Sequence, residues 1–313
     1  MPGGDSVLQG GISRAGGLLI FGAEQKKLQK ISVGGQYPKM RKILFVVNRT
    51  KPEAQRIADR LARAARGAGM DVEICGDFPV PDSAFKGADI CCVVGGDGTI
   101  LSCVRAAADF GIPIFGINLG KLGFLAHYSD SIDDASFLTL AAGEGRILER
   151  ELLEARIGGR AFVALNDFAV KSSGAAAVSG LGISADGEFI ANYVGDGLVF
   201  STPTGSTAYN LSAGGPLVHP KAKVFVMTPV CPHTLSNRSL VYDASAKIGI
   251  SCLSGDCVFV SDGRIVSDFP RGSQAEVFIS SKTVKFSRLR GHSHFSILRS
   301  KLGWAEDPRH LRQ

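Results

Sequence analysis

Residues 41–118 alternate short apolar runs with amphipathic stretches of helical length, and this alternation constrains the fold more than any other feature of the chain. Pro52 stands near the start of one helical stretch and Gly111 ends the other, as helix boundaries prefer. Strands that alternate with helices of this length predict a parallel, doubly wound sheet. The expected strands are KILFVVN, MDVEIC, ADICCVV and IPIFGIN, and the expected helices are PEAQRIADRLARAARGAG and TILSCVRAAADFG.

The pattern becomes β-rich beyond residue 146. Stretches such as RAFVALNDFAVKSS and EVFISSKTVKFSRL alternate apolar and polar residues, which is typical of strands. Asp186-Gly187 and Asp262-Gly263 have the chemistry of tight hairpin turns. We expect one clear helix in this half, starting near Ser206, with the hydroxyl of Ser206 or Thr207 as its cap.

Two domains are expected, because 313 residues exceed the size at which one hydrophobic core usually stops growing. The predicted fold class is an α/β N-terminal domain with a parallel doubly wound sheet, followed by a β-rich C-terminal domain. We assign a flexible, glycine-rich extension to residues 1–40, the α/β domain to 41–145, the β-rich domain to 146–290, and to 291–313 a C-terminal segment that packs back on the α/β domain.

Composition and charge exclude several classes of function. Seven cysteines without a CxxC pair argue against a disulfide framework and a zinc site, and favour a reducing cytoplasm. No apolar run is long enough to cross a bilayer, no secretory signal is visible, and no long basic run predicts nucleic-acid binding. We therefore expect a cytoplasmic protein without membrane or nucleic-acid partners, whose net charge of +6 suits an anionic small molecule.

The sharpest local signal is CVVGGDGTIL, an apolar strand followed by a glycine-rich turn and a helix that opens near Thr99. Gly95, Gly96 and Gly98 let backbone N–H groups approach a phosphate, and the helix start adds the positive end of its dipole. Asp97 is then either a metal ligand or a general base, because a carboxylate beside phosphates is otherwise repelled. The alternative is a turn or N-cap residue, and the motif alone leaves these readings near parity.

LNDF at residues 165–168 interrupts a strand-like stretch with two polar residues, Asn166 and Asp167. A strand end or β-bulge explains such a pair, and on its own this explanation is favoured. The functional alternative is an amide and a carboxylate that bind the sugar hydroxyls or the amide of a ligand.

The stretch STPTGSTAYNLSAGGPLV at residues 201–218 crowds seven hydroxyl side chains and three glycines between apolar runs. Hydroxyls satisfied locally around a helix cap are the structural explanation. One cap needs one hydroxyl, so the density of hydroxyls makes this explanation weak.

Five segments together resemble the NAD kinase family, in this order and at plausible separations: GGDGT at 95–99, LND at 165–167, DGLVFSTPTGSTAYNLSAGGP at 196–216, PVCPHTLSNR at 229–238 and KLGW at 301–304. The resemblance covers roughly residues 41–304. GGDGT is shared with lipid kinases of the diacylglycerol kinase type, whereas TPTGSTAY with SAGGP is far more specific to NAD kinases.

The resemblance implies that ATP, or in some members polyphosphate, phosphorylates the 2′-hydroxyl of the adenosine ribose of NAD to make NADP, with a divalent metal such as Mg²⁺. It implies a homodimer or homotetramer, and no metal ligand is assigned. It makes Asp97 the catalytic base and Gly95, Gly96, Gly98 and Thr99 the phosphate loop. The residues it places at NAD are Asp97, Gly98, Phe124, Asn166, Asp167, Asp196, Thr207, Ala208, Tyr209, Asn210, Leu211 and Ser212.

The chain departs from the family pattern at three points. Val194 stands where many members have a basic residue, the small residues of GAAAV replace a polar position, and Arg264 replaces the glutamine of a frequent DGQ. These changes bear on contacts at the nicotinamide side and between subunits rather than on the reaction.

Two alternatives remain beside NAD kinase activity. A lipid kinase of the diacylglycerol kinase type would share GGDGT but would lack the TPTGSTAY patch. A non-catalytic dinucleotide-binding protein would share the fold, but it would have no use for an unpaired Asp97 carboxylate near phosphates.

Overall fold

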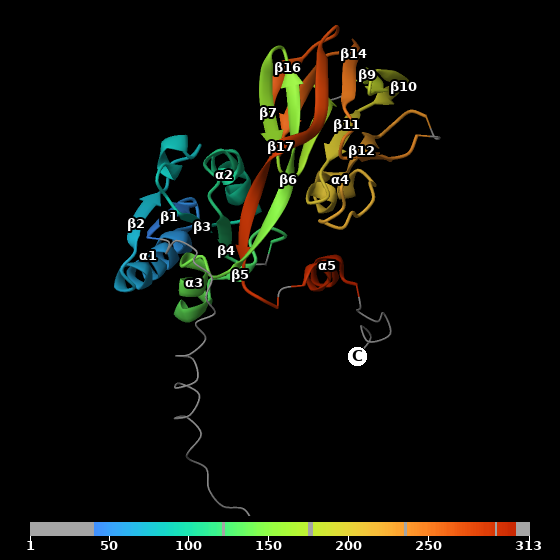
Figure 1. The fold of residues 1–313 in the computed structure, drawn as a ribbon. Helices are drawn as coiled ribbons and strands as arrows, with labels where there is room; N and C mark the ends of the chain where they lie inside the picture. The colour runs from blue at the N-terminus through green and yellow to red at the C-terminus, as the bar shows by residue number, and fades with distance from the viewer. Residues whose placement is uncertain (1–40, 121–122, 175–177, 235–236, 292, 305–313) are drawn as a thin grey trace, which may run out of the picture. The chain divides into compact units, whose positions relative to one another are not determined.

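The computed structural model of the chain describes residues 41–120, 123–174, 178–234, 237–291 and 293–304 (Figure 1). The extension predicted at residues 1–40 and the last part of the C-terminal segment, residues 305–313, lie outside the described residues. The predicted fold class is confirmed, because an α/β half with a parallel sheet precedes a half of mostly antiparallel strands.

Among the described residues, five parallel strands and three α-helices make up the α/β half. The elements are β1 (Lys42–Val47), α1 (Pro52–Gly67), β2 (Asp71–Cys75), the 3-10 helix η1 (Asp82–Phe85), β3 (Ile90–Val94), α2 (Asp97–Phe110), β4 (Ile114–Asn118), the short strand β5 (Tyr128–Ser129) and α3 (Asp134–Ala141). β1 pairs in parallel with β2 and β3, and β3 pairs in parallel with β4. α1 starts with Pro52, and Gly111 ends α2 in the left-handed conformation with φ of 69°, as the sequence predicted.

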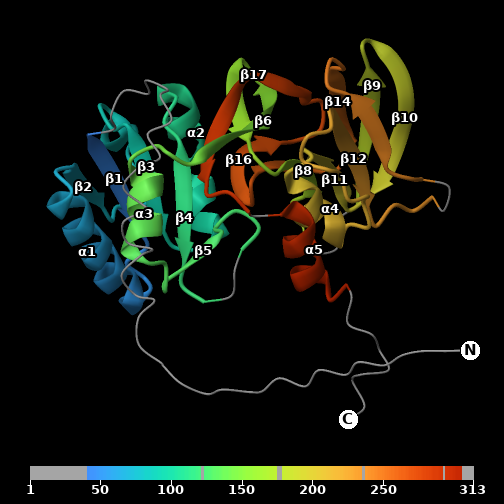
Figure 2. The ribbon, with the colours of Figure 1, turned by 60° about the horizontal axis from the view of Figure 1, so that its bottom comes forward.

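Helices cover both faces of this sheet. α1 and α3 lie on one face and α2 on the other (Figure 2). Phe45 and Phe115 pack with α1 and α3, whereas Val93 and Ile114 pack with α2. Because both faces are buried, the strands read as continuous apolar runs rather than as alternating ones. Because β1, β3 and β4 are parallel, their carboxyl ends meet at one edge of the sheet. Doubly wound sheets bind their ligands at this edge.

The β-rich half follows from residue 146 onward. Its strands are β6 (Arg146–Ile157), β7 (Arg160–Ala164), β8 (Asp167–Ser172), β9 (Ser179–Ala185), β10 (Glu188–Gly195), β11 (Gly197–Ser201), β12 (Val224–Val230), β13 (Leu240–Asp243), β14 (Ile248–Ser254), β15 (Cys257–Ser261), β16 (Arg264–Phe269) and β17 (Gln274–Arg288). Six of them form one sheet in the order β13-β12-β11-β8-β15-β16. A buried cluster that includes Phe168, Phe200, Phe225 and Phe259 packs this sheet against β6, β9, β14 and β17.

The long strand β17 joins the two halves. It pairs antiparallel with β14 and β6, and at Phe286 it pairs in parallel with Ile114 of β4. One eleven-stranded sheet consequently runs from β2 through β4 and β17 to β10 (Figure 1). The continuous sheet ties the carboxyl edge of the α/β strands to the β-rich half.

Both predicted hairpin turns are present. Asp186 and Asp262 have φ of 51° and 45°, and the glycine that follows each also has a positive φ. Two consecutive positive φ values are the signature of the type I′ turn.

The predicted helix near Ser206 is a 3-10 turn, η2 (Gly205–Thr207), followed by the short α4 (Tyr209–Ser212). The predicted cap is wrong, since no side chain caps either element. The hydroxyl of Ser206 instead donates to the carbonyl of Pro203 at 2.8 Å and accepts from the N–H of Val218 at 3.0 Å. It therefore joins the two ends of the loop.

The C-terminal helix α5 (His294–Leu302) follows β17. The rings of His294 and Phe295 both contact the ring of His219, which belongs to the β-rich half. We had expected the segment 291–313 to pack on the α/β domain instead. In the part of the chain that the structure describes, no helix is long and apolar enough to cross a membrane.

Candidate active site

The glycine-rich turn lies at the carboxyl end of β3, and α2 begins within it at Asp97 rather than near Thr99. Gly95 packs closely on Thr99, because a Cβ at Gly95 would lie 2.5 Å from Thr99 Oγ1. The amide of Asn48, which follows β1, donates to the same hydroxyl at 3.3 Å. These contacts fix the turn against the neighbouring strand end.

The carboxylate of Asp97 is held by the backbone of the loop before β5. Its Oδ2 accepts from the N–H of Phe124 at 2.8 Å, and its Oδ1 accepts from Leu125 at 3.2 Å and Ala126 at 2.9 Å. A Cβ at Gly123 would overlap this carboxylate, so only glycine fits there. The expectation of an unpaired carboxylate is therefore wrong, and so is the N-cap alternative, since no side chain caps α2.

Three N–H donors do not occupy all the acceptor positions of the Asp97 carboxylate. An ionised carboxylate has about four acceptor positions on its two oxygens. Among the described residues, two N–H groups bind Oδ1 of Asp97 and one binds Oδ2, so none of these residues uses the second position on Oδ2. Asp97 is half-buried at the start of a helix, so its side chain is partly accessible from solvent.

The LND segment is held from one side by Asp262. The carboxylate of Asp262 accepts from the N–H groups of Leu165 at 2.9 Å, Asn166 at 2.7 Å and Asp167 at 3.2 Å. The backbone N–H of Asp262 donates to the carbonyl of Asp167 at 3.0 Å in return. Asp262, in the type I′ turn, thus fixes the backbone of the segment through hydrogen bonds. The hairpin chemistry of the Asp-Gly pair did not predict this role.

The hydroxyl-rich stretch holds the same segment from the other side. Thr202 donates its hydroxyl to the carbonyl of Leu165 at 2.6 Å and its N–H to the carbonyl of Asn166 at 2.9 Å. The N–H of Gly205 donates to the Thr202 hydroxyl at 3.0 Å, and a Cβ at Gly205 would overlap the backbone of Asn166. With the backbone bound on both sides, the side chains of Asn166 and Asp167 are what the segment can offer a ligand.

Asp167 is a buried carboxyl, with 5% of its surface exposed. Burial and the negative charge of Asp262 raise its pKa to about 7, whereas Lys171 and the N–H of Tyr209 lower the pKa and offset part of this rise. Asp167 therefore changes charge near neutral pH, which is uncommon for an aspartate outside a functional site.

Lys171 and Tyr209 complete the surroundings of Asp167. Nζ of Lys171 lies 4.0 Å from the centre of the Tyr209 ring, a cation–π contact. Lys171 stands four residues after Asp167 on β8 and shares its face of the strand. A ligand that binds at Asp167 therefore meets an aromatic ring and a cation together.

One predicted binding residue of the stretch 201–218, Asn210, is used within the chain. Asn210 is fully buried; its Nδ2 donates to the carbonyl of Pro216 at 3.0 Å, and its Oδ1 accepts from Thr228 at 2.7 Å. A Cβ at Gly215 would overlap this amide. Asn210 thus holds the loop together, and the half-exposed residues Thr207, Ala208, Tyr209 and Leu211 with the exposed Ser212 remain to meet a ligand.

Asp196 lies away from this group. β11 pairs Ser201 with Asp167 and Gly197 with Lys171, so Asp196, which precedes Gly197, stands at the opposite end of the strand. Its side chain accepts a hydrogen bond from the thiol of Cys231, and this bond is the largest cause that raises the pKa of that thiol. The structure does not bring Asp196 together with Asp167 within one chain.

The three departures from the family pattern have separate positions. Val194 is 43% exposed on β10. Burial raises the pKa of Asp262, and the positive charge of Arg264 on β16 offsets part of this rise. The centre of GAAAV, residues 175–177, lies outside the described residues.

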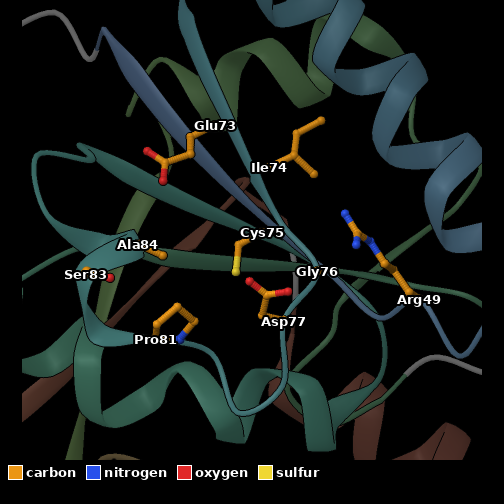
Figure 3. A pocket seen from close by; sticks show the side chains of 9 residues that line it. All are labelled: Arg49, Glu73, Ile74, Cys75, Gly76, Asp77, Pro81, Ser83 and Ala84. Atoms are coloured by element: carbon orange, nitrogen blue, oxygen red, sulfur yellow. The ribbon is translucent and has the colours of Figure 1, made fainter.

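A hollow of about 230 Å³ opens at the carboxyl ends of β1 and β2 (Figure 3). Arg49 follows Asn48, and its side chain lies across Gly76, where a Cβ would overlap the guanidinium. Asp77 and Ser83 line the same hollow. Because Asn48 contacts Thr99, this hollow adjoins the glycine-rich turn along the same edge of the sheet.

Among the residues that the structure describes, no group of three or more His, Cys, Asp or Glu side chains could hold a metal ion by itself. Mg²⁺ in phosphoryl-transfer sites is usually bound by one or two carboxylates together with substrate phosphates. The described residues therefore suit an ion that arrives with the substrate phosphates rather than a metal held by the chain alone.

Sequence reasoning missed Asp262, Lys171 and Thr202 as parts of the site. The signal for Lys171 was a lone cation in an apolar strand at an even spacing from Asp167. Asp262 and Thr202 gave no local signal beyond a turn and a polar loop, because their partners are distant in the sequence.

Two family patterns match the chain. The ATP-NAD kinase N-terminal domain matches residues 79–144, and the ATP-NAD kinase C-terminal domain matches residues 165–289. The NAD kinase of Lachnoclostridium phytofermentans is 34% identical over 283 residues, which cover 84% of this chain and 99% of that protein. The NAD kinase of Paraburkholderia phytofirmans is 40% identical over 242 residues, which cover 75% of this chain and 81% of that protein.

Solved structures share the fold. A yeast NADH kinase complexed with NADH superposes with a TM-score of 0.77 at 23% identity, over 86% of this chain and 89% of that one. An NAD kinase from Archaeoglobus fulgidus in complex with ATP superposes with a TM-score of 0.70 at 24% identity, over 85% of this chain and 99% of that one. Neither the lipid kinase nor the non-catalytic alternative is favoured by these matches. The relatives at 34–40% identity and the two matched domains show that the chain belongs to the NAD kinase family.

Proposed function

We propose that this NAD kinase transfers the terminal phosphoryl group of ATP to the 2′-hydroxyl of the adenosine ribose of NAD, with Asp97 as the base. The O2′–Pγ bond forms while the bond from Pγ to the bridging oxygen breaks, ADP leaves, and the hydroxyl proton passes to Asp97. The products are NADP and ADP.

The observation that carries this proposal is the acceptor position on Oδ2 of Asp97 that no described residue uses. Three backbone N–H groups fix the carboxylate in place, so it needs no reorientation when the hydroxyl arrives. A hydroxyl that donates to the remaining position has its proton directed at the base and its lone pairs free for attack. The adjoining N–H groups at the start of α2 favour phosphate oxygens.

We propose that the second group holds the acceptor nucleotide. Asn166 and Asp167 present an amide and a carboxyl from a backbone bound on both sides, and Tyr209 offers a ring beside them. Leu165, which precedes Asn166, packs in the same apolar cluster as Ile100 of α2 and Leu125 of the Asp97 loop. This shared core supports placing the two groups on one ligand.

ATP as the donor is proposed from the Archaeoglobus fulgidus relative, whose structure is an ATP complex. The N–H groups of the Gly95–Thr99 turn suit the donor phosphates, and Arg49 in the adjoining hollow is a candidate cation for them. We propose Mg²⁺ as the metal, held by the donor phosphates; when bound, it would neutralise charge on the transferred phosphoryl group.

A homo-oligomer and a cytoplasmic location are also proposals. All seven cysteines are free in this structure, which supports a reducing compartment.

NADP formation by the purified protein, followed with a coupled dehydrogenase, tests the reaction. ATP with Mg²⁺ and NAD should give saturable NADP formation that EDTA abolishes. Parallel reactions with polyphosphate and with NADH define the donor and the acceptor. NAD binding without any NADP formation would instead support the non-catalytic alternative.

A further inference from the structure

Two arginines that have no acidic partner among the described residues lie where β6 meets the end of β17. Arg150 pairs with Val284 across the two strands, and Arg288 stands four residues further along β17, so the two side chains share one face of the sheet. Both residues are half-buried. Among the described residues neither guanidinium forms an ion pair: Nη1 of Arg150 donates only to the carbonyl of Glu149 at 3.2 Å, and the buried Nε of Arg288 has no hydrogen-bond partner.

Two histidines join this pair from other elements. His294 is the first residue of α5, and its ring meets that of His219 edge-on with centres 5.6 Å apart. Nδ1 of His219 accepts the N–H of Lys221 at 3.3 Å, so the ring proton of neutral His219 is on Nε2, where it can be donated. No side chain caps α5, which leaves N–H groups of its first turn beside His294.

The two guanidiniums interact electrostatically as like charges, and His294 lies within reach of both. Burial and the charge of Arg150 lower the pKa of Arg288 to about 10, and Tyr128 offsets part of this. Burial, then His219, Arg150 and Arg288, lower the pKa of His294. Holding partly buried cations together without a counter-charge is unfavourable, and proteins normally pair such groups.

Space for a ligand exists next to Arg150. A hollow of about 220 Å³ lies between β6 and the loop after α4, lined by Arg150 together with Lys221 and Lys223; of the two arginines and two histidines, Arg150 alone lines it, and His219 precedes its wall residue Pro220. The two acidic residues on its wall are Glu149 and Glu151, and Glu151 is already paired with Lys223 at 2.5 Å. The walls therefore keep an excess of positive charge.

We propose that Arg150, Arg288, His219 and His294 form a binding site for a phosphate-type oxyanion, additional to the groups around Asp97 and Asp167. Guanidinium forks match the oxygens of a phosphate in pairs, and a helix start adds further N–H donors. Because β17 runs parallel to β4 at Phe286, Arg288 lies toward the same edge of the sheet as the glycine-rich turn. The ligand is an inorganic phosphate or the end of a polyphosphate chain.

Calorimetric titration of inorganic phosphate into the full-length protein tests this site, with NAD and ATP absent and ionic strength matched by chloride. Wild type should show saturable binding, and Arg288→Gln and Arg150→Gln should each raise the Kd at least tenfold. Arg290→Gln, which removes the same charge from an exposed position two residues away, should leave the Kd within twofold. Parallel titrations with tripolyphosphate and with citrate show whether the site binds a chain of phosphates or a tricarboxylate more tightly than free phosphate.

Thermal unfolding gives a second readout that does not depend on the kinase reaction. In phosphate-free buffer Arg288→Gln should melt at a higher temperature than wild type, because an uncompensated charge is removed, and phosphate should raise the melting temperature of wild type alone. The proposal is overturned if wild type shows no saturable phosphate binding. It is equally overturned if Arg288→Gln and Arg150→Gln bind phosphate as wild type does while Arg49→Gln does not, since the ion would then lie in the donor region.

Discussion

Oδ1 of Asp262 accepts a hydrogen bond from the backbone N–H of Asn166 at 2.7 Å, across 96 residues of sequence. The same carboxylate also binds the N–H groups of Leu165 and Asp167. A turn residue at the tip of one hairpin thereby sets the position of the two polar side chains that we assign to NAD.

Asp262→Asn should weaken both the fold and NAD binding. An amide has one oxygen, so at least one buried N–H loses its acceptor, which costs about 1–3 kcal/mol in the free energy of unfolding. The KM for NAD should rise, because Asn166 and Asp167 lose their fixed backbone. Urea unfolding and steady-state kinetics measure the two effects, with Asp268→Asn on exposed β16 as the control. If Asp262→Asn had the same unfolding free energy and the same KM for NAD as wild type, Asp262 would not set the position of Asn166 and Asp167.

Asp167 should make the stability of the protein depend on pH around neutrality. Its pKa is raised to about 7 in the folded state from an ordinary value of 3.8, so the folded state holds the proton more tightly than the unfolded chain. The stability from this proton is complete below the ordinary pKa and is lost as the pH rises through about 7.

Asp167→Asn removes that titration. Relative to wild type, the variant should gain unfolding free energy between pH 4 and pH 8, by an amount on the order of 1–4 kcal/mol. Urea unfolding at both pH values gives the difference. A constant difference between the two proteins across this range would show that Asp167 does not titrate there.

Tyr209→Ala should weaken NAD binding by roughly 1–3 kcal/mol, through the lost contact of the ring with the dinucleotide. Calorimetry measures the Kd, and the melting temperature controls for the fold. Since Lys171 packs on this ring, Lys171→Met should produce a smaller loss. An unchanged Kd for Tyr209→Ala would mean that the ring only covers Lys171.

Gly123→Ala should lower kcat although it adds only a methyl group. The new Cβ would overlap the carboxylate of Asp97, so the carboxylate or the loop must move away from the N–H groups that hold it. A misplacement of about 1 Å at such a group can cost about 10²-fold in rate. Gly67→Ala, whose Cβ would meet nothing within 4 Å, is the matched control. Wild-type kcat in both variants would show that the Asp97 position is not set by this loop.

Local features of the sequence predicted most of the fold. Apolar runs, Pro52 and Gly111 marked the strands and helices of the α/β half, and two Asp-Gly pairs marked the hairpins. These signals act within a few residues, so a single sequence displays them. The resemblance to NAD kinases then indicated Asp97, Asn166 and Asp167 as site residues.

The contacts that hold those residues could not be predicted in the same way. Asp97 is bound by backbone N–H groups 27 to 29 residues away, and these donors are the same for any side chain. The hydroxyl of Ser206, expected as a helix cap, and that of Thr202, which was assigned no role, both bind carbonyls of the chain itself. Which hydroxyl faces a ligand depends on the register in which β8 and β11 pair. This register cannot be predicted from the sequence of either strand alone.

The kcat of Asp97→Asn in the NADP-forming reaction tests the central claim most directly. The amide oxygen can still accept N–H groups of the loop, whereas the NH₂ group leaves at least one of them without its acceptor and cannot take a proton from the 2′-hydroxyl. In the folded variant that still binds NAD, kcat should fall by ~10²–10⁴, the usual contribution of a positioned general base. A folded variant that keeps more than about a third of the wild-type kcat would contradict the assignment of Asp97 as the base.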